Sequence, residues 1–190
     1  ARLVTGSDPG WRGDLMGQFH MEGTADAAHI TTRLRATGVH RAEFAPQTLL
    51  DFDANCNAVY HFTERTLENL ACDSPLGPGR IRLTGSIAEL EPQTRLQADL
   101  SSVPVAAILD ALRTLRNNID AGLQAAGTVS GSIVYNTSAA QAAVQGKAAR
   151  GHAARTAAQG PLTGSLTVDG LELSGGGLSQ PLRAPKFTLQ

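Results

Sequence analysis

The sequence lacks an excess of charge of either sign, and this absence restricts the partners it can have. Among 190 residues, Lys and Arg number 16 and Asp and Glu number 17, so the formal net charge is −1. Proteins that hold nucleic acid electrostatically carry a basic surface, and this balance argues against that class. The longest apolar run is far shorter than the ~20 residues that cross a bilayer, so no segment is expected to span a membrane.

Aromatic residues and catalytic motifs are also scarce. Aromatics make up 4% of the chain, whereas Gly occurs 20 times, a composition that suits a thin or repetitive β structure better than a compact enzyme. The sequence contains no nucleophile elbow, phosphate-binding loop or dinucleotide fingerprint. Its five His residues show no metal-ligand spacing. We therefore predict no catalytic residue, no metal site and no cofactor.

The only two cysteines, Cys56 and Cys72, are spaced for a cross-strand disulfide. From Leu50 to Phe62, apolar residues take the even positions and polar residues most of the odd ones, which is typical of a half-buried strand. A hairpin centred on Glu64 places the two cysteines opposite each other, within the distance that a disulfide spans. Such a bridge indicates an oxidising compartment such as a periplasm. Two buried free thiols in a reducing compartment are the main alternative, and a metal-binding or catalytic thiol is a further one.

The same alternation continues along most of the chain. It occurs over residues 15–23, 30–37, 81–87 and 96–100, and short polar breaks separate these runs. Successive alternating runs of this kind predict an antiparallel meander.

One segment follows helical spacing instead. Ser101 and Ser102 are candidate caps, and Pro104 stands where a first helical turn accepts proline. These features predict one amphipathic helix over about residues 103–117. Its expected apolar stripe consists of Val105, Ile108, Leu109, Leu112, Leu115 and Ile119.

A short motif of apolar residue, Ser or Thr, Gly, Ser and apolar residue recurs around Gly85, Gly131 and Gly164. Each Gly falls on the apolar side of its predicted strand, where a missing side chain leaves room for a bend, a bulge or a close neighbour. Strands that bend at these glycines predict a curved, trough-like sheet. Ordinary β-sandwich patterning is the alternative interpretation.

The chain is predicted to form one β-rich module over residues 1–190. Residues 137–159 break the pattern, because they are rich in Ala and contain no large apolar residue besides Val144. We predict a flexible loop there. Lys147, Arg150 and Arg155 leave a basic docking arm as the alternative.

A family resemblance rests on the stretches Trp11–Gly17, Leu50–Cys56, Cys72–Pro75 leading to Gly85, Leu100–Val105, Ala126–Ser132 and Leu166–Gly175. These stretches resemble the AsmA family of bacterial envelope proteins, specifically a C-terminal part of one. The resemblance implies a long periplasmic β-groove held in the inner membrane by an N-terminal helix. The family's proposed work is to move phospholipid towards the outer membrane or to support outer-membrane assembly, and it has no catalytic residues to transfer. This chain is then a fragment, with its anchor outside it and neighbouring β-modules of the same full-length chain as partners.

The apolar side of the sheet is the predicted functional surface. A sheet of about eight strands needs a cover on its apolar side, and a single helix covers only part of it. We expect the remainder to hold phospholipid acyl chains, since each buried CH₂ contributes roughly 0.8 kcal/mol. For any single residue, ordinary packing against the helix is the alternative. The candidate lining residues are Leu83, Ile87, Leu96, Leu100, Val129, Ile133, Leu162 and Leu166.

Three functions therefore follow from the sequence. The first is a non-enzymatic, lipid-holding module of the periplasm, in a protein anchored to the inner membrane. The second is a structural or protein-interaction β-sandwich that covers its own core. The third is an envelope hydrolase, for which Asp51, Asp53 and His61 are the best candidates.

Overall fold

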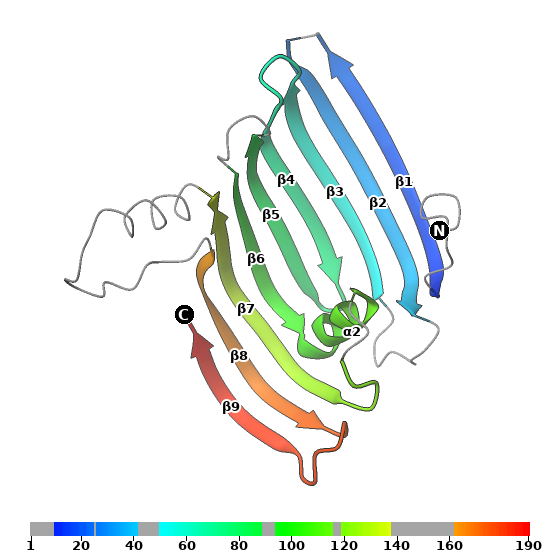
Figure 1. Ribbon diagram of the computed structural model, residues 1–190, viewed down its shortest axis with the longest axis vertical. Helices are drawn as coiled ribbons and strands as arrows, with labels where there is room; N and C mark the ends of the chain where they lie inside the picture. The colour runs from blue at the N-terminus through cyan, green and yellow to red at the C-terminus, as the bar shows by residue number, and fades with distance from the viewer. Residues whose placement is uncertain (1–9, 25, 42–49, 89–93, 116–118, 138–161) are drawn as a thin grey trace, which may run out of the picture.

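The described residues fold into one open, curved antiparallel sheet with a single short helix (Figure 1). The computed structural model describes residues 10–24, 26–41, 50–88, 94–115, 119–137 and 162–190. Each strand pairs with the next one along the chain, so the predicted curved meander is confirmed and the described strands do not form two facing sheets. The strands are β1 (Trp11–Gly23), β2 (Ala28–Arg41), β3 (Leu50–His61), β4 (Thr66–Leu76), β5 (Gly79–Ala88), β6 (Arg95–Pro104), β7 (Gln124–Asn136), β8 (Leu162–Ser174) and β9 (Leu182–Leu189), and helix α2 (Val105–Leu115) joins β6 to β7.

The alternation of the sequence becomes the two faces of this sheet. In β2, the odd-numbered residues from His29 to Arg35 are exposed, whereas Ile30, Thr32 and Leu34 between them are half-buried. Successive side chains of a strand point to opposite faces, so one face collects the apolar residues and the other the charged ones.

Helix α2 lies over one end of the apolar side. It contacts β2 and β3 as well as β6 and β7. The curvature of the sheet, visible in Figure 1, brings these strands within reach of one short helix. The helix thus closes one end of a trough.

The helix begins later than the sequence predicted. β6 continues through Pro104 and α2 begins at Val105, so Ser101 and Ser102 belong to a strand and do not cap the helix. Ser102 has a φ of 48°, and its N–H donates to Ser130 Oγ at 2.9 Å. The strand register shifts at this point, and this bulge keeps the chain in the sheet where capping residues would otherwise start a helix.

The buried side of α2 also differs from the predicted stripe. Leu112 is 43% exposed, whereas Asp110, Arg113 and Thr114 are buried. Arg113 Nη1 donates to Asp110 Oδ1 at 3.0 Å, so a charged pair takes positions that periodicity assigned to solvent. The buried core beneath the helix is small and consists of Leu76, Val103 and Ala107, with Ile81, Leu100 and Ile108 packed against it.

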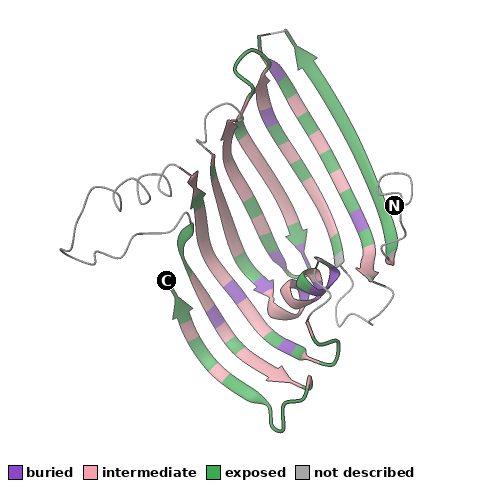
Figure 2. Cartoon of the chain, in the orientation of Figure 1, coloured by how far each residue is buried: buried purple, intermediate pink, exposed green. Residues whose placement is uncertain are grey.

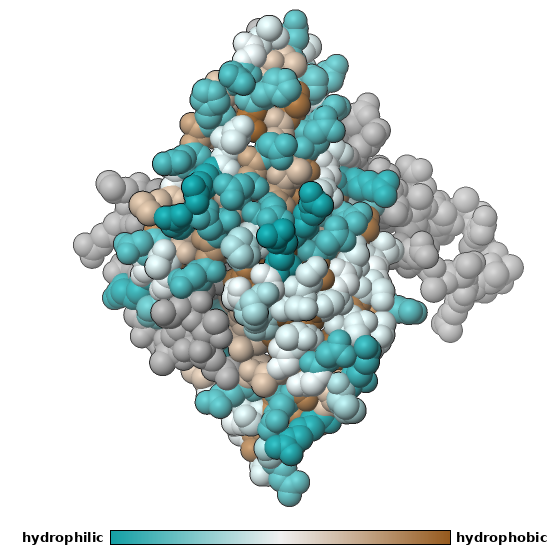
Figure 3. All heavy atoms as spheres, turned by 180° about the vertical axis from the view of Figure 1, so that it is seen from behind, coloured by the Kyte–Doolittle hydropathy of each residue, from teal (hydrophilic) through white to brown (hydrophobic). Residues whose placement is uncertain are grey.

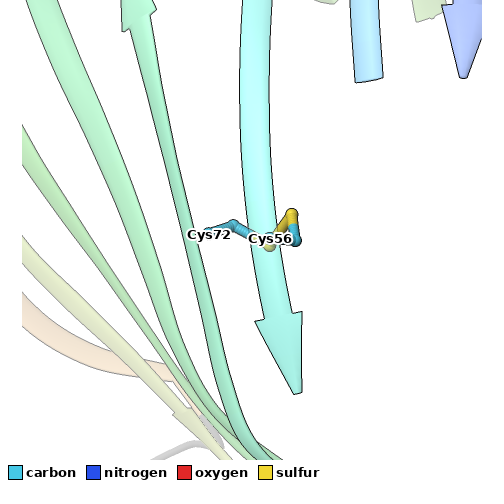
Figure 4. The surroundings of a disulfide bond; sticks show 2 residues. All are labelled: Cys56 and Cys72. Atoms are coloured by element: carbon cyan, nitrogen blue, oxygen red, sulfur yellow. A yellow bond between two sulfur atoms is a disulfide. The ribbon is translucent and has the colours of Figure 1, made fainter. Parts of the chain in front are cut away.

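The predicted disulfide between Cys56 and Cys72 is present (Figure 4). The two residues pair directly across β3 and β4, with a Cα–Cα distance of 4.0 Å. Near the turn, His61 pairs with Thr66, and a bulge between there and the cysteines moves the register by one residue. Asn69, in the bulged strand, has a φ of 52°. The cysteines are therefore brought opposite each other by the bulge as well as by the turn.

Some predictions fall on other parts of the chain. Apart from Thr137, the predicted loop over residues 137–159 lies outside the described residues, as do residues 116–118 at the predicted end of the helix.

Candidate functional site

The strand register brings all eight predicted lining residues to one face. Leu83 pairs with Ala98, and Ala98 pairs with Ile133 on the next strand. Directly opposed residues of antiparallel strands point to the same side of the sheet, so each such row can be followed from strand to strand.

This side of the sheet is called the apolar face below, and its members follow from the strand pairs. It comprises Leu15, Gly17, Phe19 and Met21 of β1; Ile30, Thr32, Leu34 and Ala36 of β2; Phe52, Ala54, Cys56, Ala58 and Tyr60 of β3; Leu67, Leu70, Cys72, Ser74 and Leu76 of β4; Ile81, Leu83, Gly85 and Ile87 of β5; Leu96, Ala98, Leu100 and Val103 of β6; Val129, Gly131, Ile133 and Tyr135 of β7; Leu162, Gly164, Leu166 and Val168 of β8; and Phe187 and Leu189 of β9.

The apolar face carries no charged side chain among these residues. Its only polar side chains are those of Thr32 and Ser74 and the hydroxyl groups of Tyr60 and Tyr135. An uncharged face that crosses every described strand is far more extensive than the scattered apolar residues of an ordinary protein surface.

Burial divides the eight predicted lining residues into two groups. Val129 is buried opposite Val103, and Leu100 packs against the same core under α2. These two residues therefore pack in the ordinary core under the helix, which was the alternative expected for any single lining residue. Leu162 is 61% exposed, and the other five remain half-buried because no described element lies over them as α2 does over the core.

The apolar face also includes exposed residues that sequence reasoning did not assign to it. Phe19 is 63% exposed, and Met21, Tyr135 and Leu189 are also exposed. Figure 2 shows this exposure along both edge strands of the sheet. Alternation in residues 15–23 was the available signal, but it does not tell which strands are neighbours.

The three motif glycines lie on the apolar face where two backbones approach closely. Gly85, Gly131 and Gly164 have φ values of 151°, 144° and 154°. A Cβ atom added to any of them would overlap a carbonyl oxygen of the adjacent strand. The glycines do not face one another, since Gly131 pairs with Leu166 and Gly164 with Ile133. The close approaches are therefore staggered across the sheet.

A Gly131→Ala variant is expected to lose about 1–3 kcal/mol of its free energy of unfolding, because alanine is strained at this φ and its methyl group meets backbone. Urea denaturation followed by circular dichroism measures the loss. Gly17→Ala is the matched control, since a Cβ at Gly17 meets only Leu34 Cδ1 at 3.8 Å, an ordinary contact. Equal losses in the two variants would contradict the role assigned to Gly131.

The opposite side of the sheet carries the charges, and Figure 3 shows hydrophilic side chains over much of it. Arg33 Nη2 and Arg35 Nη2 lie 2.6 Å and 2.8 Å from Asp53 Oδ2. Hydrogen bonds from Arg33 and then Arg35 hold the pKa of Asp53 well below its usual range. The Gln97 amide, followed by Ser132, lowers the pKa of Asp99 in the same way. Arg33 and Arg35 reach Asp53 from the neighbouring strand, whereas Gln97 and Asp99 lie on the same strand, β6.

The three candidate hydrolase residues do not converge. Asp51 Oδ1 accepts a hydrogen bond from Gly38 N at 2.6 Å, and Asp53 is held by two arginines. His61 lies at the other end of β3 from Asp53, about 26 Å away along an extended chain. Its Nε2 atom is 3.6 Å from Glu68 Oε2 on β4. The structure therefore does not bring these three residues together in the arrangement of acid, base and nucleophile that hydrolysis needs.

Comparison of the chain with protein-family models, with curated proteins and with solved structures gave no match. In the part of the chain that the structure describes, no helix has the length and hydrophobicity to cross a membrane. Within the same residues, no cluster of three or more His, Cys, Asp or Glu side chains is placed to hold a metal ion.

Proposed function

We propose that the chain is a non-enzymatic module that holds phospholipid acyl chains on its apolar face. The observation that carries this proposal is the uncharged face that crosses all nine described strands; within the described residues, helix α2 covers only one end of it. Acyl chains suit such a surface because they need area without directional partners. Ten methylene groups withdrawn from water contribute about 8 kcal/mol before the cost of ordering the chain.

The proposed setting is the periplasm of a bacterium, in an AsmA-like protein anchored to the inner membrane. The disulfide between Cys56 and Cys72 supports an oxidising compartment. The resemblance supports a role in moving phospholipid between the inner and outer membranes or in outer-membrane assembly, with neighbouring β-modules of the longer chain continuing the groove.

A protein-interaction module is the second candidate function. It is favoured by the two edge strands, since an edge strand offers backbone hydrogen-bonding groups to a partner. In that case another polypeptide, and not a lipid, covers the apolar face.

Lipid extraction followed by mass spectrometry tests the proposed function. Protein purified without detergent is expected to carry phospholipid, and the delipidated protein is expected to bind a fluorescent fatty acid. An Ile133→Lys variant is expected to bind that probe at least about tenfold more weakly, because it places a charge in the middle of the apolar face.

Val134→Lys is the matched control for this variant. Val134 is a β-branched, half-buried neighbour on the same strand, but it pairs with Gln97 on the charged side. It should leave probe binding unchanged. Leu162→Lys, compared with Thr163→Lys, repeats the comparison at positions that are both exposed, so neither change disturbs packing. Absence of lipid from repeated preparations, together with no binding of the probe, would refute the proposal.

A further inference from the structure

The two ends of the apolar face differ in chemistry. At one end, beside the core under α2, lie the aliphatic side chains of Ile81, Leu100 and Ile108, which are only partly buried. The opposite end, called the open end below, is where β3 and β7 finish and β8 begins. No helix of the described residues lies over the open end, since α2 lies at the other one (Figure 1).

Both tyrosines of the sequence lie at the open end, each one residue before its strand finishes. On the apolar face, Tyr60 pairs with Leu67 and Tyr135 pairs with Leu162. The ring of Tyr60 meets the edge of Phe62, with 5.0 Å between the centroids. Within the described residues, neither tyrosine hydroxyl has a hydrogen-bond partner. The rings therefore extend the apolar surface, whereas the hydroxyl groups can bond to a ligand.

The distance between the two ends matches the length of an acyl chain. On β7, Val129 is buried beside the core and Tyr135 stands at the open end, and this part of the strand extends about 20 Å. The side chains of the apolar face between them are Gly131 and Ile133, which carry no polar group. The acyl chains of one leaflet span about 15 Å, half of a bilayer's hydrocarbon core. An acyl chain that lies along the strands therefore fits between the core and the tyrosines.

We propose that phospholipid lies along the strands with the methyl ends of its acyl chains at α2 and its ester and phosphate groups at Tyr60 and Tyr135. The inference rests on the proposed function, to which it adds the orientation of the lipid and the residues that recognise its polar part. A tyrosine hydroxyl donates to an ester or phosphate oxygen while its ring stays among apolar groups, which is why tyrosine is common at membrane interfaces.

The reverse orientation lacks these contacts. It brings the phosphate against the side chains of Ile81, Leu100 and Ile108, which offer no hydrogen bond, and a charged group without a partner is costly to bury. The proposed orientation makes the open end the place where lipid enters and leaves. It also keeps the outer edges of β1 and β9 available to the neighbouring β-modules of the proposed function.

Spin-labelled phospholipid tests the orientation on the full wild-type chain, after lipid has been removed. Two phosphatidylcholines are compared, one with a nitroxide at the methyl end of an acyl chain and one with a nitroxide beside the ester group. Methyl signals in nuclear magnetic resonance spectra broaden close to a nitroxide. The methyl-end label is expected to broaden Ile81 and Ile108 most, and the ester-side label Leu67 and Leu162. The reverse pattern, or equal broadening at both ends, would overturn the orientation.

The double variant Tyr60→Phe with Tyr135→Phe tests the hydroxyl groups, because it removes both and keeps the rings. It is expected to bind lauroyl lysophosphatidylcholine about fivefold more weakly than the wild type in calorimetric titrations, since a hydrogen bond to the polar part of the lipid is lost. Diphenylhexatriene, an apolar probe without a headgroup, should bind to both proteins equally well. Unchanged binding of the lysophospholipid, or equal weakening for both ligands, would overturn the role of the hydroxyl groups.

Thr163→Val is the matched control for this variant. It removes a hydroxyl group near the same end of the sheet, but Thr163 pairs with Val134 on the charged side. It should change the binding of neither ligand, and weaker lysophospholipid binding in this variant would contradict recognition on the apolar face.

The failure of this inference differs from the failure of the proposed function. A wild-type chain that binds no phospholipid refutes both. A wild-type chain that binds phospholipid with the ester-side label beside Ile81 leaves the proposed function standing and overturns only the orientation.

Discussion

An Arg113→Met variant is expected to lose about 3–5 kcal/mol of its free energy of unfolding. The side chains of Arg113 and Asp110 are only 3% and 2% exposed. Removing the guanidinium breaks a buried ion pair, which is far more costly than losing an exposed one. Urea denaturation of the full chain, followed by circular dichroism, measures the loss.

Arg183→Met provides the control for this variant. Arg183 and Glu172 form an ion pair of the same 3.0 Å length, but their side chains are 73% and 40% exposed. Its loss is expected to cost less than about 1 kcal/mol. A loss from Arg113→Met no larger than that of Arg183→Met would contradict the assignment of a buried pair.

A double variant separates the charge pair from the rest of the contribution of Arg113. Asp110→Leu combined with Arg113→Met removes both charges of this pair, so it should be more stable than Arg113→Met alone. It should not regain the full stability of the wild type. Arg113 Nη2 also donates to the carbonyl oxygens of Asp120 and Leu123, and these bonds hold the connection into β7 against the helix.

The strands and the disulfide could be predicted because their signals are local. A period of two marks each strand, and each strand pairs with the next along the chain, so the order of the sheet follows the order of the sequence. The start of the helix could not be predicted in the same way. Ser101, Ser102 and Pro104 are equally suited to a helix cap and to the end of a strand, and a bonding partner on β7 decides between them.

The apolar face was only partly predictable for a related reason. Alternation shows which residues of a strand share a side, but bulges interrupt it, as at Asn69. Whether Leu100 and Val129 belong to a covered core or to the open face depends on where α2 packs. The buried side of that helix includes the Asp110–Arg113 pair, which no apolar periodicity reveals.

Replacing Cys56 and Cys72 together with alanine is expected to lower the free energy of unfolding by about 3 kcal/mol. The bridge closes a hairpin over a sequence separation of 16, and a loop of that length is constrained in the unfolded chain by about this amount. Dithiothreitol should produce a similar loss in the wild type. The same reductant should leave the double-alanine variant unchanged, because the chain has no other cysteine.

Hydrogen exchange distinguishes a local effect of losing the disulfide on β3 and β4 from a general loss of stability. Cys56 and Cys72 pair just beyond the bulge at Asn69, where the register of β3 on β4 has already shifted. Without the covalent link, backbone amides of these two strands should exchange faster with solvent in hydrogen-exchange experiments. Amides of β7 and β8, which no disulfide joins, should follow only the global loss of stability. A uniform increase across all strands would show that the bridge acts through the unfolded chain alone, and that the bulge holds its register without it.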